Sequence, residues 1–231
     1  HKSQGRARLD VVAPFWAAVM ILGVCLLLTL SRTAALGALA SLLALGLLLF
    51  FSGQASLSRA AWTGVLATGL VALAVVIFGE PLVERFSRLD ADQTARGELY
   101  ALHWQAFLAS PLGGVGLGNF DILHRTLLDG ENLQRLWINR AAHNVYLQWL
   151  VESGLPGAAP MFLLVGLILV RTLAGATQRT RMVHLICALA AANLVVLIHG
   201  AADFALQTPS FAMMWSLLLG LQLALAQSRR R

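Results

Sequence analysis

The stretch that decides the fold is TAALGALASLLALGLLLFF, residues 33–51, which carries no charged side chain. A run of roughly 17–25 apolar residues is long enough to cross the hydrocarbon core of a bilayer as a helix. We therefore predict an all-α, polytopic membrane protein with about six transmembrane helices, since similar runs occur at 11–30, 60–79, 156–170, 182–202 and 211–226. Residues 144–151 predict a short interfacial helix before the fourth span, because Glu152, Gly154 and Pro156 interrupt the pattern.

The charges divide unevenly between the two sides that these spans would separate. Both termini and the loops at 52–59 and 171–181 carry ten basic residues and one acid, a net charge of +9. The other side has seven arginines and ten acids, a net of −3, which recovers the overall +6. By the positive-inside rule we expect cytoplasmic termini and a partly helical periplasmic loop at 80–142. Residues 1–231 are expected to form one domain of the bacterial inner membrane, and the start at His1 indicates part of a longer protein.

Several function classes fit this sequence poorly. Cys25 and Cys187 lie singly in apolar runs, so no disulfide or zinc framework is expected. The histidines lack metal-ligand spacing, and Asp90-Ala91-Asp92 is interpreted as solvated loop, so no metal and no other cofactor is predicted. The basic residues flank membrane spans, which argues against nucleic-acid binding.

The outer loop contains a predicted helix followed by a glycine-rich segment. Residues 94–109 place Arg96, Tyr100, His103 and Phe107 on one helix face. The proline of the Ser-Pro pair at 110–111 ends the helix. The segment GGVGLGNF at 113–120 follows a helix rather than a strand, so it is not a dinucleotide fingerprint. Its glycines either make a plain turn, the more frequent case, or approach a ligand closely.

A few polar residues stand where the loop and the spans meet. His143 begins the helix that returns to the membrane, and it is either structural, the commoner case, or a general base. Arg32 is either a hairpin tip or a binder of an anionic headgroup. Asn193, His199 and Asp203 join helices or line a site, and the i, i+4 spacing of His199 and Asp203 allows them to pair.

The order of these motifs resembles the bacterial O-antigen ligase and O-antigen polymerase superfamily, which includes pilin O-oligosaccharyltransferases. The matching segments extend over nearly the whole chain: LSRTA at 30–34, Arg96 opening a helix that runs to SPLGGVGLGNF at 110–120, AHNVYL at 142–147, ESGLPG at 152–157 and HGAADF at 199–204. Tyr100 stands where members often carry tryptophan. Members usually have about twice as many spans, so the resemblance identifies this chain with a C-terminal half.

This resemblance implies an inverting, metal-independent glycosyltransferase. It would move a glycan from an undecaprenyl-pyrophosphate carrier to an acceptor hydroxyl of lipid A-core at the periplasmic face. Carried over residue by residue, His143 would be the general base, and Arg32 and Arg96 would bind the pyrophosphate. The remaining candidate substrate-binding residues are Tyr100 and Asn144, and then Arg88, Gly116, Asn119, His199 and Asp203. An imidazole with a pKa near 6.5 can accept the hydroxyl proton, and guanidinium forks can stabilise the departing pyrophosphate.

Other functions stay open at this level. An O-antigen polymerase or a protein O-oligosaccharyltransferase would differ from a ligase only in the acceptor. A transporter or flippase of lipid-linked glycans would use the same arginines without breaking a bond, although such proteins more often carry charges at mid-membrane. The density of loop motifs disfavours a non-catalytic scaffold.

Overall fold

The computed structural model describes residues 18–19, 21–26, 29, 31–56, 69, 89–178 and 182–227, with only the backbone for residues 32, 89–93 and 178. The elements are α2 (Arg32–Phe51), α4 (Leu89–Ala109), α5 (Phe120–Leu127), α6 (Leu133–Leu136), α7 (Val145–Gln178), α8 (Val183–Gly200), the 3-10 turn η1 (Ala205–Gln207) and α9 (Pro209–Gln227). This part of the chain contains no strand, which confirms the predicted all-α class.

Four described helices have the length and composition to cross a membrane, namely Thr33–Phe51, Val145–Thr177, Val183–Gly200 and Pro209–Gln227. They correspond to the predicted spans at 33–51, 156–170, 182–202 and 211–226. The predicted spans at 11–30 and 60–79 lie largely outside the described residues. The membrane-spanning character of the chain is therefore confirmed.

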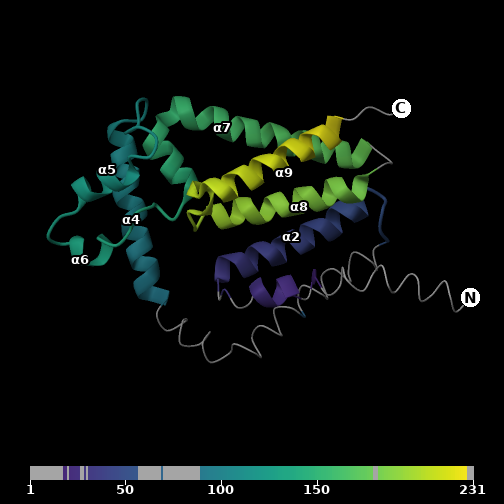
Figure 1. Ribbon diagram of the computed structural model, residues 1–231, viewed down its shortest axis with the longest axis horizontal. Coiled ribbons are helices and arrows are strands. Elements are labelled where there is room, and N and C mark those ends of the chain that lie inside the picture. The colour runs from purple at the N-terminus through teal and green to yellow at the C-terminus, as the bar shows by residue number, and fades with distance from the viewer. Residues whose placement is uncertain are drawn as a thin grey trace, which may run out of the picture.

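The four spanning helices lie side by side, and α8 contacts α2, α7 and α9 (Figure 1). The beginning of α2 lies beside the end of α8, because a Cβ at Gly37 would meet Val195 and Ile198 at 3.7 and 3.8 Å. At the other end of α2, Ser52 lies 3.8 Å from the Cys187 sulfur. Small residues let membrane helices approach this closely. Helix α4 crosses one end of the bundle, which we call the α4 end (Figure 1).

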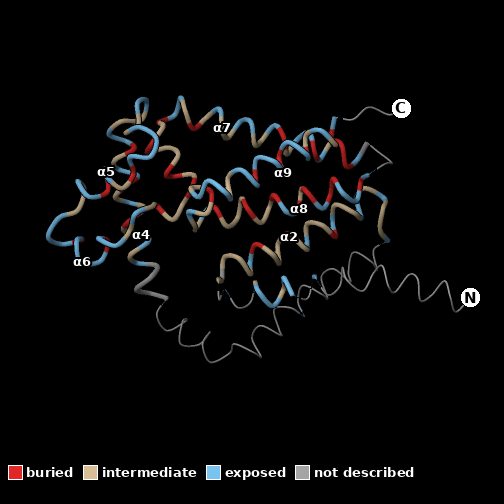
Figure 2. The backbone as a smooth tube through the Cα atoms, in the orientation of Figure 1, coloured by how far each residue is buried: buried red, intermediate tan, exposed pale blue. Residues whose placement is uncertain are grey.

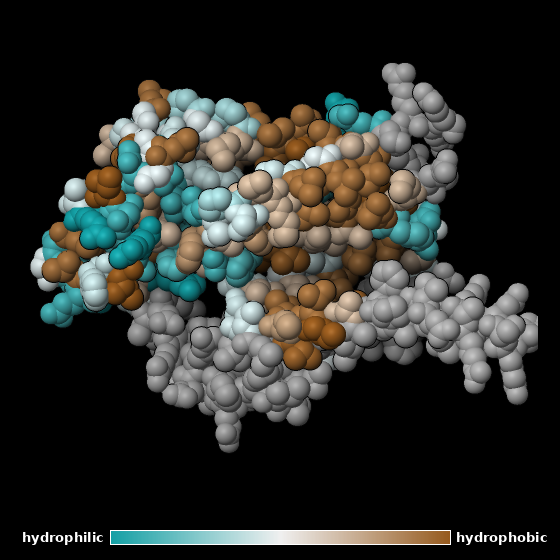
Figure 3. Space-filling view, viewed as in Figure 1, coloured by the Kyte–Doolittle hydropathy of each residue, from teal (hydrophilic) through white to brown (hydrophobic). Residues whose placement is uncertain are grey.

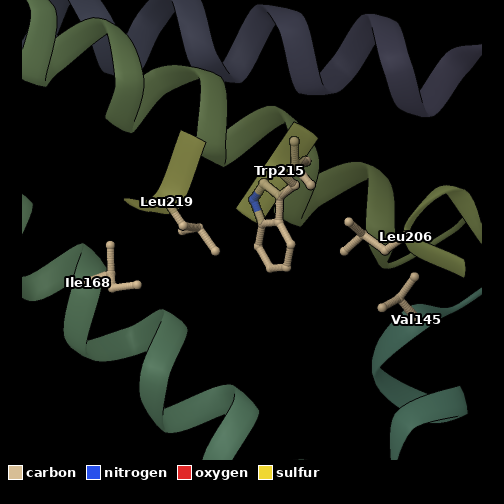
Figure 4. Close-up of a cluster of buried hydrophobic side chains, with 6 residues drawn as sticks. Val145, Ile168, Leu206, Trp215 and Leu219 are labelled. Carbon is tan, nitrogen blue, oxygen red and sulfur yellow. The ribbon is translucent and has the colours of Figure 1, made fainter. Parts of the chain in front are cut away.

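Apolar side chains fill the centre of the bundle and also cover its outside. Figure 2 shows buried positions along α7, α8 and α9. Figure 4 draws a cluster of buried apolar side chains from α7, α8, η1 and α9: Val145, Ile168, Val196, Leu206, Trp215 and Leu219. Leu163, Met213 and Leu217 are more than 70% exposed, at 72%, 73% and 73%. The apolar outer surface in Figure 3 is suited to contact with lipid.

A chain of buried hydrogen bonds joins α7, α8 and α9 inside the bundle. Gln222 donates to the Thr172 hydroxyl over 2.7 Å and accepts from the Asn193 amide. The Asn193 carbonyl oxygen accepts from the Trp215 indole. Asn193 thus joins helices, one of the two roles predicted for it.

Helix α7 is broken at Gly154, whose φ of 62° and ψ of −176° are not helical. Only glycine adopts this conformation without strain. A short segment from Val145 to Ser153 packs against α4, and the longer segment after Gly154 runs along the bundle (Figure 1). A short helical segment therefore precedes the fourth span, as predicted, and its interfacial position stays a prediction.

A second core lies where α4, α5 and the first segment of α7 meet, and contains Phe107, Phe120, Ala142, Leu147 and Val151. His103 is fully buried in the same region and stacks on Phe120 with ring centroids 4.3 Å apart. On the helix face predicted at 94–109, Phe107 and His103 are buried. The interpretation of Asp90 and Asp92 as loop residues is wrong, because α4 begins at Leu89 and their backbone is helical.

Candidate active site

His143 lies two residues before Val145, the first residue of α7, and has a left-handed backbone with φ of 50°. Few residues other than glycine adopt this conformation, and a polar side chain there is a common mark of a functional constraint. Asn144 follows it, and the Asn144 side-chain oxygen accepts from the Leu147 N–H over 3.1 Å. Asn144 therefore caps the helix. The Asn144 amide nitrogen is not used by this cap and can donate to a substrate.

Two aromatic side chains hold His143 in place. The Tyr100 hydroxyl on α4 donates to the His143 carbonyl oxygen over 2.9 Å. The Phe204 ring, just after α8, meets the imidazole edge to face, with centroids 5.0 Å apart and planes at 85°. The imidazole is half-buried. Segments far apart in the sequence thus converge on this one residue.

Burial, more than the charges nearby, favours the neutral form of the His143 imidazole. Burial lowers the His143 pKa below 6.5, the positive charge of Arg96 lowers it further, and Asp203 raises it. Burial also raises the pKa of the Tyr100 hydroxyl, which Arg96 lowers and Asp203 raises, as they do for His143. Arg96 and Asp203 therefore lie in the electrostatic field of both groups. The structure brings together four of the predicted site residues.

Asp203 is paired with His199, as the spacing of the two residues predicted. The His199 Nε2 lies 3.2 Å from one carboxylate oxygen of Asp203. The other oxygen accepts from the Phe204 N–H over 2.6 Å. Asp203 therefore connects the end of α8 to the ring that packs on His143. The His199 Nδ1 is buried and has no hydrogen-bond partner in the described part of the chain.

Of the three arginines predicted at the site, the structure describes the side chain of Arg96 alone. The Arg96 side chain is exposed on α4, one helical turn before Tyr100. Arg32 is the first residue of α2, capped by the Ser31 hydroxyl, which accepts from the Ala34 N–H over 3.3 Å. The start of α2 belongs to the same α4 end of the bundle as His143, but the Arg32 side chain lies outside the description. Arg88 lies outside the described residues.

A cleft of about 460 Å³ opens beside His143, between α4 and the first segment of α7. Its walls are mostly aromatic or aliphatic: Tyr100, Ala101, Trp104, Asn144, Tyr146, Leu147 and Leu150. The Tyr146 hydroxyl is engaged in donating to the Leu197 carbonyl over 2.6 Å, which joins α7 to α8. The cleft therefore offers a largely apolar surface next to a polar centre, the usual character of a ligand site.

The predicted residues Gly116 and Asn119 belong to a tight turn rather than to the group around His143. Gly114, Gly116 and Gly118 all have positive φ, between 61° and 93°. The Asn119 amide donates to the Val115 carbonyl over 2.9 Å and closes the turn. A Cβ at Gly114 would lie 2.5 Å from the Glu152 carbonyl oxygen, so the segment packs directly on the α7 backbone. These contacts favour the plain-turn interpretation.

Sequence reasoning missed Phe204 as a neighbour of His143, and it gave Glu152 no role in the site. A usable signal was present for the carboxylate. Gln148 and Glu152 are polar residues at i and i+4 in an otherwise apolar helix, and both are buried. Buried polar side chains are normally hydrogen-bonded to a specific partner. No comparable pattern marked Phe204. No group of three or more His, Cys, Asp and Glu side chains able to hold a metal occurs within the described residues.

The fold and the site together define a polytopic membrane protein with a histidine and an arginine grouped at one end of its helix bundle. The family model described as O-antigen ligase matches residues 17–162, and the chain belongs to this family. It is thus a bacterial membrane protein of a family of glycosyltransferase-like ligases and polymerases acting on lipid-linked glycans. Comparisons with curated proteins and with solved structures each gave no match.

Proposed function

We propose that this protein is an O-antigen ligase-type glycosyltransferase. It transfers a glycan from undecaprenyl pyrophosphate to a hydroxyl of lipid A-core at the periplasmic face of the inner membrane. The observation that carries the proposal is the environment of His143, a half-buried imidazole kept neutral beside Arg96 at the α4 end of the bundle. A general base needs a pKa close to or below the working pH, and this environment supplies one.

The proposed reaction uses one proton transfer and one displacement. His143 takes the proton of the acceptor hydroxyl while that oxygen attacks the anomeric carbon. The bond from this carbon to the pyrophosphate oxygen breaks with inversion, and the pyrophosphate leaves with its bonding electrons. Arg96 and Arg32 bind the growing negative charge through paired N–H donors. The negative field of Asp203 stabilises the imidazolium that forms.

The cleft between α4 and α7 fits the lipid part of the donor. Its lining is largely apolar, and Tyr100 and Asn144 connect it to the residue that would act as base. A pyrophosphate held by Arg96 would leave the first isoprene units beside Trp104 and Leu150. Such a position would leave the charged part of the carrier in water and its hydrocarbon against apolar side chains.

Transfer by the full-length protein in detergent, with excess chelator, tests the proposal. Undecaprenyl-pyrophosphate glycan and lipid A-core are the substrates, and the wild type is compared with His143→Ala. We expect the wild type to transfer glycan, and His143→Ala to bind donor but not to transfer it. His184→Ala is the matched control, because His184 is exposed near the opposite end of α8 and should leave transfer unchanged.

Each other outcome would correct a separate part of the proposal. Undiminished transfer by His143→Ala would remove the base assignment. Loss of transfer on adding chelator would overturn the metal-independent mechanism. Absence of transfer by folded wild type would reject the ligase and direct the assay to glycan polymerisation, to a pilin acceptor, and then to transport of the intact lipid-linked glycan.

A further inference from the structure

Glu152 is a carboxylate buried in the first segment of α7, with only 4% of its surface exposed. One carboxylate oxygen accepts from the Gln148 amide over 3.0 Å. The other accepts from the Gly118 N–H over 3.2 Å. No cation is paired with it in the described part of the chain. A buried charge is costly unless its oxygens are satisfied, so these two bonds define its environment.

The hydrogen bonds through Glu152 form a chain with a fixed direction. The Ala142 N–H can only donate, and it faces the Gln148 side-chain oxygen at 3.2 Å. The Gln148 NH₂ group must then point the other way, to Glu152. Since the Gly118 N–H also only donates, the group at 152 has to accept at both ends. A carboxylate meets this requirement and a carboxamide does not.

One end of this chain is the N–H of Ala142, the residue before His143. The left-handed backbone of His143 persists only if its surroundings fix it. Tyr100 holds the carbonyl that follows, Asn144 caps the helix after it, and Gln148 holds the N–H of Ala142 before it. Loss of the Gln148 contact would release the residue on the N-terminal side of the imidazole.

The other end of the chain is the glycine-rich segment. The Val115 N–H donates to the Val151 carbonyl over 3.0 Å, and the Gly116 N–H donates to the Glu152 carbonyl over 2.9 Å. The contact from Gly118 to the Glu152 side chain extends this pairing. Glu152 therefore connects the segment after α4 with the segment that carries His143.

We infer that Glu152 is a positioning residue, which acts through Gln148 and the Ala142 N–H to fix His143 in the conformation required for proton transfer. This inference rests on the proposed role of His143 as base. What the inference requires at position 152 is a side chain whose two terminal atoms both accept hydrogen bonds. The carboxylate matters because both of its oxygens accept, and its negative charge has no further role.

Exchange of the two side chains tests the inference. In Glu152→Gln one carboxylate oxygen is replaced by an NH₂ group, which only donates. This new NH₂ group faces either the Gln148 NH₂ group or the Gly118 N–H, two donors, so one hydrogen bond is lost in either orientation of the amide. In Gln148→Glu/Glu152→Gln the carboxylate at 148 accepts from Ala142 and from the new amide, whose oxygen accepts from Gly118. All three bonds are then restored in the reversed pair. Glu131→Gln is the control, with the same charge change on an exposed loop.

Two readouts are used on the full-length protein. In the transfer assay, Glu152→Gln should lower kcat by roughly tenfold, with donor KM changed less than about twofold, and the double exchange should recover most of the loss. In the second, diethylpyrocarbonate modification of His143 is followed by mass spectrometry without substrate. The rate of this modification should change severalfold in Glu152→Gln and return towards the wild-type rate in Gln148→Glu/Glu152→Gln.

The outcomes separate this inference from the proposed function. Absence of transfer by wild type rejects the function, and the modification rate still decides whether Glu152 positions His143. An unchanged modification rate in Glu152→Gln overturns the inference. Failure of the exchange to restore it, in a protein with the wild-type melting temperature, also overturns it, because the acceptor pattern would then not be the requirement.

Discussion

His143 combines a strained backbone with a neutral side chain, and the two properties have different sources. The Tyr100 hydroxyl donates to the His143 carbonyl, and the N–H of the preceding residue, Ala142, donates to Gln148. The side-chain pKa is lowered mainly by burial, then by Arg96, against the opposing charge of Asp203. Substitution of either charged neighbour should therefore move the pKa without removing the imidazole from its position.

The first prediction concerns the pH dependence of transfer. If neutral His143 is the base, wild-type kcat/KM should rise with pH through a pKa below 6.5 and then level off. Asp203→Asn removes a charge that raises this pKa, so the acidic limb should move to lower pH. Arg96→Gln removes a charge that lowers this pKa, so the acidic limb of the activity that this variant retains should move to higher pH. The profile of each variant is compared with Asp121→Asn, an acid on α5, which should not move it. A limb that stays fixed in both variants would contradict the assignment.

The second prediction concerns His103, which is fully buried and has a pKa lowered to about 4, chiefly by burial. The unfolded chain takes up this proton near pH 6.5, whereas the folded chain does not take it up until about pH 4. The stability from this group is complete above 6.5 and is lost as pH falls towards 4, by roughly 3 kcal/mol in total.

Acidification should therefore loosen the packing of α4 on α5, and limited proteolysis of residues 110–140 at neutral and acidic pH measures it. His103→Phe keeps a ring against Phe120 without a titrating group, so its cleavage should depend less on pH. Equal acid sensitivity in this variant and the wild type would mean that other groups control the transition.

At the scale of elements, the sequence predicted the helices better than the contacts between them. Apolar runs fix the spans at 33–51 and 182–202 because a bilayer demands length and hydrophobicity, both of which are local properties. The break at Gly154 was also predictable from the glycine and Pro156. The packing of the glycine-rich segment on that break was not predictable, because it is a contact between residues about forty positions apart.

The candidate site shows the same limit. The resemblance to a family supplied His143, Arg96 and Tyr100, and the structure groups them with Asp203. Phe204 could not be predicted, because a phenylalanine after a membrane span has many possible neighbours. The double acceptor role of Glu152 depends on the direction of an N–H from a distant turn. Such directions follow from tertiary structure alone.

The third prediction tests the break in α7. A Cβ at Gly154 would lie 2.7 Å from the Leu112 carbonyl oxygen, and its φ of +62° strains any other residue. Gly154→Ala should therefore lower stability by about 1–3 kcal/mol and reduce transfer. Gly166→Ala, with no atom within 4 Å of the new methyl group, is the matched control and should leave the melting temperature unchanged or slightly raised. Equal melting temperatures for the two variants would show that the glycine-rich segment does not pack on the break.

At the scale of the whole molecule, function depends on which side of the membrane the α4 end faces. The start of α2 and the end of α8 belong to this end (Figure 1), and His143 lies there through its contacts with Tyr100 of α4 and Phe204. The charge distribution along the sequence predicts that it is periplasmic, since the termini and loops predicted for the cytoplasmic side have the excess of basic residues. The donor and acceptor proposed for this protein require the same orientation.

The fourth prediction tests this orientation by cysteine labelling of the full-length protein, with Cys25 and Cys187 replaced by alanine. Gln134→Cys lies on exposed α6, and Thr177→Cys lies exposed at the far end of α7. A membrane-impermeant maleimide should label position 134 in spheroplasts, and should label position 177 only after detergent is added. The reverse pattern would put His143 on the cytoplasmic side of the membrane. The proposed transfer to lipid A-core takes place on the periplasmic side, so His143 could not reach the acceptor. Ligation would then be rejected even if the arrangement around His143 were correct, because a base and an arginine can act only on substrates that reach their side of the bilayer.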